Sequence, residues 1–508
     1  LLLSLLMMTG CDFMDCDESD NFTKQEVLDS YNRVKQLATN VYGFLKADFC
    51  SIDGAMLDAA TDDAVHIYKS SNIQRFVDGT WSANNLVDNV WGHYYEGIRA
   101  ANFYLKETAG LTFDEWKYSD DYEAIMKEFT NYQYEVRFLR AYFYFELIKR
   151  YRNIPFVLDV LAQNEATKEK GRVTRAAAMA LKSRVTLYMA SPLFSEDSED
   201  KWKQAAEAAY DIIKQKTDLG LDLVPYPQIF NDVNNQKAEV ILYRPTGESG
   251  DFEKANFPIG VEGGKTSTCP TQNLMEAYDM KDGTPFVWNN QSDPYDNRDP
   301  RMKYTIVCNE MKWPVDPVEI WEGGTNGLPL QNATTTGYYL KKYVNNTISF
   351  EAGSTVTKKQ HNWVLFRYGE ILLNYAEAMI NAFHDPNYKD AVYNMSAREA
   401  VNQIRGRTNI SLPGFPSDIT EKDFVKRLKN ERRVELAFEG HRFWDVRRWK
   451  ELGQTANIYG VKITKNNEVI SYEKFLLETR AVTDNMYFYP IPNTERFKNP
   501  NLGQNPGW

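Results

Sequence analysis

The chain has 508 residues, 43% of them hydrophobic and 14% aromatic, with 31 tyrosines and 11 tryptophans. This apolar fraction excludes disorder over the whole length, and the chain is long enough for about two to four average domains or one large one. The formal net charge of −11 argues against a nucleic-acid binder, which would need a basic surface. Abundant tyrosine and tryptophan favour a recognition surface, because these side chains offer large, stiff, amphipathic contact area.

The N-terminus indicates export. Residues 1–10 are mostly apolar but too short to span a bilayer, so we expect them to be a truncated signal peptide. Residues 8–11, Met-Thr-Gly-Cys, resemble a lipobox, which predicts a lipidated Cys11; the alternative is an ordinary secretory signal followed by a chance cysteine. Residues 11–22 are acidic and predict a flexible tether. The lipid on Cys11 is then the only membrane attachment that we expect.

Helical periodicity dominates two regions, residues 23–217 and 363–450. Thr23 is expected to form a capping box with Glu26 at the start of the first helix. Alanine-rich helix pairs with large aromatic residues are typical of tetratricopeptide (TPR) repeats, although the period here is not strict. The predicted fold class is therefore mainly α, an irregular TPR-like helical-repeat scaffold forming an α-α superhelix. We predict helices at residues 24–45, 85–107, 122–151, 174–189, 202–214, 365–381, 391–407 and 423–439.

Between these regions the composition changes. Residues 218–362 are rich in proline, glycine, asparagine and tryptophan, with only short alternating runs such as 240–243. Long loops of this kind usually carry function, so we predict a loop-rich ligand-binding insertion with short strands. Residues 451–508 are expected to form an extended C-terminal segment. Residues 23–508 are predicted to be a single domain.

A charged stretch closes the second helical region. Glu431, Glu435 and Glu439 continue a helical stripe that begins with apolar residues, and Arg442 would join it if the helix continued. If the stripe is buried, each glutamate needs a partner, because an unpaired buried charge is very costly. We predict an ion-pair clasp formed with local arginines, chiefly Arg432 and Arg442. The alternatives are a solvated charged helix and an active site. Gly440 is expected to end the helix.

The same stretch carries a family resemblance. Residues 430–449 read Asn-Glu-Arg-Arg-x-Glu-Leu-Ala-x-Glu-Gly-x-Arg-x-x-Asp-x-x-Arg-Trp, which resembles the C-terminal signature of the SusD/RagB family. Further matches lie at 91–102, 297–302, 376–378 and 487–508, in the family's order. The resemblance implies a surface lipoprotein that captures nutrients for a SusC-like TonB-dependent outer-membrane transporter. It also implies the SusD-like helical scaffold and attachment to the outer membrane, facing the cell exterior.

Catalytic signatures are absent from the sequence. It contains no His-Glu-x-x-His, no Gly-x-Ser-x-Gly, no Gly-x-x-x-x-Gly-Lys-Ser/Thr loop and no Cys-x-x-Cys. The five histidines are isolated, and nothing selects a catalytic pair of carboxylates. We therefore predict no catalytic residue, no metal and no cofactor apart from the lipid. The remaining cysteines have irregular spacing and leave three disulfide pairings open: Cys16, Cys50, Cys269 and Cys308.

Binding chemistry remains. A sugar ring stacks its apolar face on tyrosine or tryptophan, while aspartate, asparagine and arginine bind its hydroxyls. In starch-binding relatives a Trp-x-x-Asn step supplies both contacts, and Trp81 and Asn84 match its spacing. For each aromatic residue the alternative is packing, and for the charged residues it is a structural salt bridge. The candidate ligand-binding residues are Asp62, Asp63, Arg75, Trp81 and Asn84 in a first loop, and Trp288, Tyr295, Trp313 and Trp321 in a second.

These observations favour a non-enzymatic lipoprotein that binds oligo- or polysaccharide in an aromatic pocket and delivers it to a SusC-like transporter. One alternative is the same architecture capturing peptides, as the RagB branch does. Others are a lipid-anchored glycoside hydrolase and a helical scaffold without a ligand.

Overall fold

The computed structural model describes residues 22–155, 172–196, 199–230, 237–289, 293–351 and 357–508. The predicted signal peptide, Cys11, Cys16 and almost all of the tether lie outside these residues. In the described part of the chain, no helix has the length and apolar character needed to cross a membrane.

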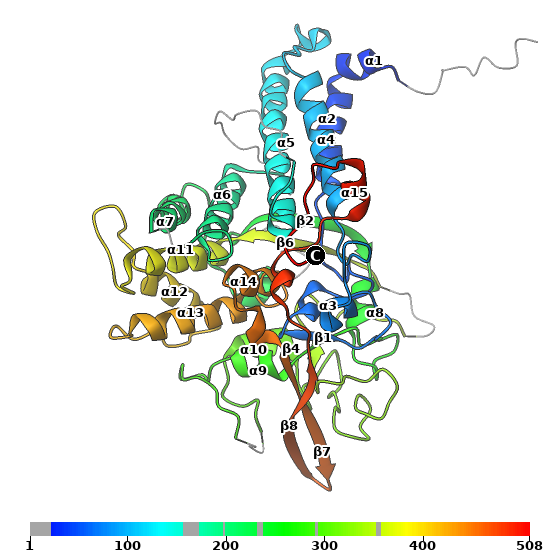
Figure 1. Cartoon of the computed structure of the whole chain (residues 1–508), viewed down its shortest axis with the longest axis vertical. Helices are drawn as coiled ribbons and strands as arrows, with labels where there is room; N and C mark the ends of the chain where they lie inside the picture. Colours follow the sequence, from blue (N-terminus) through cyan, green and yellow to red (C-terminus); the bar gives the residue numbers. More distant parts are fainter. Residues whose placement is uncertain (1–21, 156–171, 197–198, 231–236, 290–292, 352–356) are drawn as a thin grey trace, which may run out of the picture.

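Helices form the upper and left parts of the molecule (Figure 1). Those of the first half are α1 (Lys24–Asp29), α2 (Tyr31–Tyr42), α3 (Gln74–Asp78), α4 (Trp91–Glu107), α5 (Tyr122–Tyr151), α6 (Arg175–Ala190) and α7 (Glu199–Ile213). Those of the second half are α8 (Asp251–Asn256), α9 (Gln272–Ala277), α10 (Pro300–Thr305), α11 (Tyr368–Phe383), α12 (Ala397–Arg405), α13 (Glu421–Glu435), α14 (Arg442–Arg448) and α15 (Asn493–Lys498). Short 3₁₀ turns include η2 (Leu57–Ala60) and η4 (Tyr226–Ile229).

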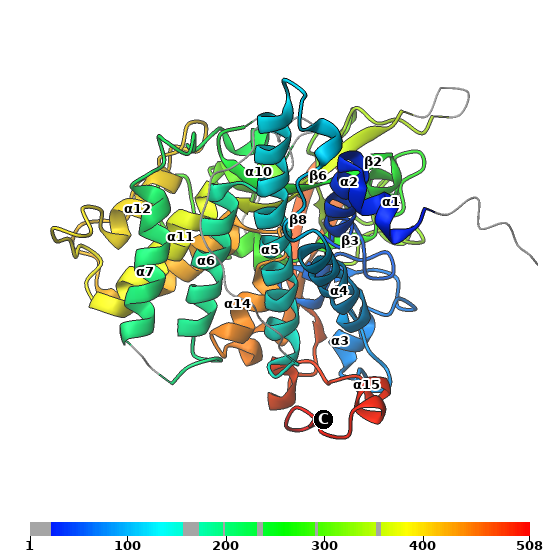
Figure 2. The ribbon, with the colours of Figure 1, turned by 90° about the horizontal axis from the view of Figure 1, so that it is seen from above.

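Neighbouring helices pack in pairs, as the repeat pattern predicts. Helix α4 packs on α5, α6 on α7, and α11 on α7, α12 and α13. Seen from above, α4, α5, α6 and α7 lie in a row (Figure 2). Small residues allow the close approach: Ala177 and Ala209 are fully buried, and a Cβ added at Gly97 would lie 2.9 Å from the Phe143 ring. The mainly α fold is thus confirmed.

Local signals explain most helix ends. The Thr23–Glu26 capping box is present, and α5 has the bounds that its periodicity predicts. The helix predicted at 24–45 is interrupted at Ser30, whose backbone is extended. The last long helix ends at Glu435 and not at Gly440, because the chain already turns at Phe438, which has a φ of 58°. Glu439 therefore lies in the turn between α13 and α14.

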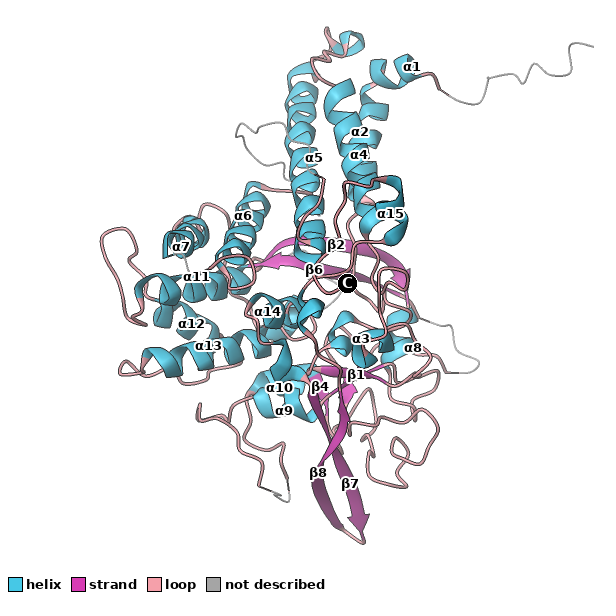
Figure 3. Cartoon of the chain, viewed as in Figure 1, coloured by secondary structure: helices cyan, strands magenta, loops and turns pink. Residues whose placement is uncertain are grey.

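Strands pair in small antiparallel sheets in the middle region and near the C-terminus (Figure 3). The sheet β2–β6 crosses the centre, below α5, and the hairpin β7–β8 projects from the lower end (Figure 1). The pairs in the described residues are β1 (Ala64–His66) with β3 (Thr268–Pro270), β2 (Val240–Ser249) with β6 (Lys359–Arg367), β4 (Ile306–Val307) with β5 (Tyr339–Leu340), and β7 (Asn457–Asn466) with β8 (Val469–Thr479).

Candidate ligand pocket and the buried ion pairs around it

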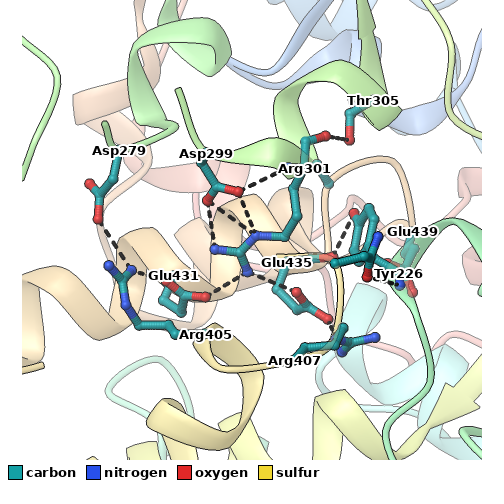
Figure 4. A network of polar contacts seen from close by, with 12 residues as sticks. Tyr226, Asp279, Asp299, Arg301, Thr305, Arg405, Arg407, Glu431, Glu435 and Glu439 are labelled. Atoms are coloured by element: carbon teal, nitrogen blue, oxygen red, sulfur yellow. Dashed lines mark hydrogen bonds and ion pairs between the residues drawn. The ribbon is translucent and has the colours of Figure 1, made fainter. Parts of the chain in front are cut away.

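Glu435, at the end of α13, is the centre of a buried ion-pair network (Figure 4). Its fully buried carboxylate accepts hydrogen bonds from Arg301, Arg367 and Arg407 at 2.7–2.8 Å. Glu239 accepts bonds from both Arg367 and Arg407, at 2.8 and 2.7 Å. Burial raises the pKa of Glu435, but the charges of the three arginines outweigh it and hold the pKa well below its ordinary value. The carboxylate is therefore ionised and serves as a structural anchor.

The other two glutamates of the stripe are bound in the same way. Glu431 accepts from Arg301 and Arg405 at 2.6 and 2.7 Å, and Glu439 accepts from Arg367 and Lys342 at 2.7 and 2.8 Å.

The partners predicted for this clasp are wrong. Arg432 donates to Asp445 at 2.8 Å, and Arg442 donates to Asp62 at 2.9 Å. Arg432 follows Glu431 by one position and so points about 100° away around the helix. The arginines that bind the glutamates come instead from α10, from the end of β6 and from the end of α12 and the turn after it.

A second cluster joins α11 to α14. Glu377 accepts hydrogen bonds from Arg448 Nη2 and from Trp449 Nε1, both at 2.7 Å. Arg448 also donates to Asp445 at 2.8 Å. Burial raises the pKa of Glu377, but the charge of Arg448 outweighs it and lowers the pKa to about 2.

We expect the protein to lose stability in acid. The pKa of Glu377 falls from its usual 4.5 to about 2 on folding, so its contribution is fully present above pH 4.5 and is lost as the pH falls through 2. The shift is worth about 3 kcal/mol, of which about 2 kcal/mol is lost between pH 7 and pH 3. Urea unfolding at the two pH values measures the loss. Glu377→Gln should be less stable at pH 7 and should show a smaller difference; an equal difference would contradict the assignment.

The carboxylates of the first predicted loop have structural partners. Asp62 is bound by Arg442 at 2.9 Å, and Asp63 by Arg433 at 2.6 Å. Both aspartates are at least 96% buried, so they connect the segment before β1 to α13 and α14 and lie away from the surface. Arg75 is half-buried on α3 and forms no ion pair with the residues described.

Trp81 occupies a different place from the one predicted. Its side chain is 2% exposed, and its ring lies against Trp508 and Tyr489 with centroid distances of 4.6 and 5.2 Å. No face of the indole is open to a sugar ring. Asn84 is exposed and accepts a hydrogen bond from Asn493 at 2.8 Å. The Trp-x-x-Asn step therefore packs the C-terminal segment against the scaffold.

The aromatic residues of the second loop are dispersed. Tyr295 is buried against Tyr472, with ring centroids 5.3 Å apart. Trp288 is half-buried, as is Trp321, whose ring lies 4.1 Å from the ammonium of Lys465. Trp313 lines a cavity and is the predicted residue that the structure places in a candidate site.

This cavity, the Trp313 pocket, has a volume of about 440 Å³ and lies among η4, the segment after β5 and the start of β6. Its size is within the range of about 300–1,000 Å³ that is usual for ligand sites. Its aromatic residues are Phe230, Tyr304, Trp313 and Tyr343, and its polar residues are Lys341, Lys342, Asn345, Asn346, Thr347, Lys359, His361 and Asn362.

Aromatic contacts fix the wall of the pocket. Tyr343 stacks on Trp363 with centroids 5.3 Å apart and planes 21° apart, and Phe230 meets Tyr343 edge-on at 5.0 Å. Tyr343 and Trp313 are mostly covered, so the half-buried Phe230 and Tyr304 supply much of the open aromatic surface. No sequence pattern singled out Phe230, Tyr304 or Tyr343, because their grouping depends on segments distant in the chain.

A smaller cavity of about 100 Å³ lies between α5, α14 and the segment around Asp48. Its charged walls are paired with each other: Arg150 donates to Asp88 at 2.7 Å and to Glu146 at 2.6 Å. Since one water needs about 10–15 Å³, this space has room for several waters but is too small for an oligosaccharide.

In the part of the chain that the structure describes, no three histidine, cysteine or acidic side chains are grouped to hold a metal ion. Cys50, Cys269 and Cys308 are free thiols.

Comparison with known proteins identifies the family. A family model described as "SusD family" matches residues 229–508, and one described as "Starch-binding associating with outer membrane" matches residues 12–215. The helical-repeat fold defines a SusD-like architecture, and this chain belongs to the SusD family.

Solved structures agree over almost the whole chain. A SusD-like protein from Bacteroides fragilis has 25% identity and a TM-score of 0.76, covering 96% of this chain and 99% of its own. A SusD-like carbohydrate binding protein from the same species has 22% identity and a TM-score of 0.75, with coverages of 94% and 100%. Surface glycan-binding protein A from Bacteroides fluxus has 20% identity and a TM-score of 0.64, also with coverages of 94% and 100%.

A curated relative matches over a shorter stretch. SusD-like protein P2 of Formosa agariphila is 29% identical over 163 residues, which is 31% of this chain and 28% of that relative. The match thus spans little more than a quarter of the relative's length.

Proposed function

We propose that this protein is a surface-exposed outer-membrane lipoprotein that binds oligosaccharide in the Trp313 pocket and delivers it to a SusC-like TonB-dependent transporter. Lipid on Cys11 would anchor it with the folded part facing the cell exterior. Membership of the SusD family supports this, as do the outer-membrane description of the N-terminal match and the glycan-binding names of two similar structures. The protein acts by binding alone.

The composition of the pocket is the observation that carries the proposal. The rings of Phe230 and Tyr304 can cover the apolar face of a sugar. The amide of Asn346 and the hydroxyl of Thr347 lie at the same rim and are exposed, so they can exchange hydrogen bonds with ring hydroxyls. Stacking with hydrogen bonds gives reversible binding, which a carrier that must release its cargo requires.

Removing an aromatic wall should weaken binding. We expect Tyr304→Ala and Trp313→Ala each to lower the affinity for the bound oligosaccharide about tenfold or more, the effect of losing about 1.4 kcal/mol. Isothermal titration against a panel of polysaccharides and oligosaccharides measures it. Tyr304 is half-buried, so Tyr304→Ala should keep its melting temperature even if Trp313→Ala does not. Trp321→Ala, outside the pocket, is the matched control.

Three outcomes would contradict the proposal. Unchanged binding in both pocket variants would place the ligand elsewhere. Binding of peptides and of no glycan would favour the peptide-capturing alternative. Release of reducing sugar by the purified protein would show that it is an enzyme.

A further inference from the structure

The charge of the Trp313 pocket differs from that of the chain as a whole. The protein has a formal net charge of −11, yet the pocket is lined by three lysines and a histidine, and by no aspartate or glutamate. A lining of one sign in a low-dielectric cleft concentrates the potential there and attracts ligands of opposite charge.

Two of these cationic or ionisable groups have carboxylate partners. The ammonium of Lys342 donates to Glu439 at 2.8 Å and to the carbonyl of Ala437 at 2.6 Å. His361 Nε2 lies 2.7 Å from Glu253. These groups are held by the protein itself, so they shape the pocket and leave a ligand little charge to bind.

Lys341 differs from them. It is half-buried and forms no ion pair with any described residue; its ammonium donates a weak hydrogen bond to Met311 Sδ, at 3.7 Å. Burial lowers its pKa, and the nearby charge of Lys303 acts in the same direction. A cation that loses water without gaining a carboxylate is costly, so an anion entering the pocket relieves that cost.

The ammonium of Lys341 lies over the indole of Trp313, 4.9 Å from the centre of the ring. This cation–π contact supports the charge but supplies no anionic acceptor. The indole Nε1–H is itself buried without an acceptor among the described residues and is closed to solvent, so the ammonium is the group that a ligand can reach. The ligand that complements it presents acceptors, and a carboxylate or sulfate presents the strongest ones.

We propose that the Trp313 pocket selects acidic oligosaccharides, with Lys341 binding a carboxylate or sulfate of the sugar while the neighbouring rings cover its apolar face. The inference rests on the proposed function and specifies its ligand class. The aromatic wall favours a sugar over a free inorganic anion, because a small anion leaves Phe230 and Tyr304 without a contact.

Matched ligands test this selectivity. The wild-type protein is titrated with an oligogalacturonide, with the same oligosaccharide after reduction of its carboxylates to alcohols, and with a sulfated galacto-oligosaccharide. We expect at least one acidic ligand to bind about tenfold or more tightly than the reduced one, with an affinity that falls as salt rises. Tight binding of the oligogalacturonide would identify a carboxylate as the bound anion, and tight binding of the sulfated galacto-oligosaccharide would identify a sulfate.

Variants at one position separate charge from packing. Lys341→Gln should bind the acidic and the reduced oligosaccharide with equal affinity and without salt dependence, and Lys341→Arg should retain both the preference and its salt dependence. Lys358→Gln removes an exposed lysine outside the pocket and should behave as the wild type. The inference is overturned if the wild-type protein binds acidic and reduced ligands with equal affinity. It is also overturned if Lys341→Gln keeps the full preference for the acidic ligand. In both cases the proposal that the protein binds glycans is unaffected. Binding of no glycan at all overturns the proposed function itself.

Discussion

Glu435→Ala should lower the free energy of unfolding by roughly 3–5 kcal/mol, the usual cost of breaking a buried ion pair. Three guanidinium groups bind this carboxylate at 2.7–2.8 Å, so its removal leaves an excess of positive charge where water cannot reach. Urea unfolding followed by circular dichroism measures the loss.

The same substitution elsewhere on α13 is the matched control. Glu421 pairs with His384 at 2.7 Å, but both side chains are largely exposed, and such pairs contribute little. Glu421→Ala should therefore unfold at nearly the wild-type urea concentration. If Glu435→Ala also did so, or if it lost ligand without losing stability, the structural role of Glu435 would be wrong.

Trp81→Ala should also lower the free energy of unfolding by roughly 3–5 kcal/mol, because it leaves a cavity among rings that cannot collapse easily. The rings of Trp508 and Tyr489 lose their packing partner, so the C-terminal segment loses contacts that hold it against the scaffold. Ligand affinity should be unchanged once the variant is folded. The exposed neighbour Asn84 provides the control, since Asn84→Ala removes no buried contact.

Titration of Trp81→Ala distinguishes the two roles considered for this residue. Loss of ligand with an unchanged melting temperature would restore Trp81 to a binding surface. Loss of stability with full binding in the folded fraction would establish it as core.

Periodicity and end signals predict the scaffold because they are local. The bounds of α5 and the capping box at Thr23 follow from residues within a few positions of each other. The burial of the glutamate stripe can also be predicted from the sequence, since the stripe continues an apolar face. The arginines that bind these glutamates cannot be predicted in this way. Arg301, for example, lies 130 positions before Glu431, and no local pattern specifies that contact.

The candidate site was less predictable for the same reason. A tryptophan three residues before an asparagine has the same spacing whether its ring faces solvent or, as for Trp81, the last residue of the sequence. The sequence predicts Trp313 as a candidate but does not indicate Lys341, because a lysine without an ion pair is recognised only when every neighbouring carboxylate is placed.

The network around Glu435 also constrains the order of folding. Without residues 431–439, the carboxylates Asp279, Asp299 and Glu239 remain to balance Arg301, Arg367, Arg405, Arg407 and Lys342. That surplus of cations cannot be buried without a cost of several kcal/mol per unpaired charge. Contacts between segments so far apart in sequence form late and slowly. The centre of the protein therefore closes only after residues near the C-terminal end have been synthesised, and a chain ending before α13 should remain open and prone to aggregation.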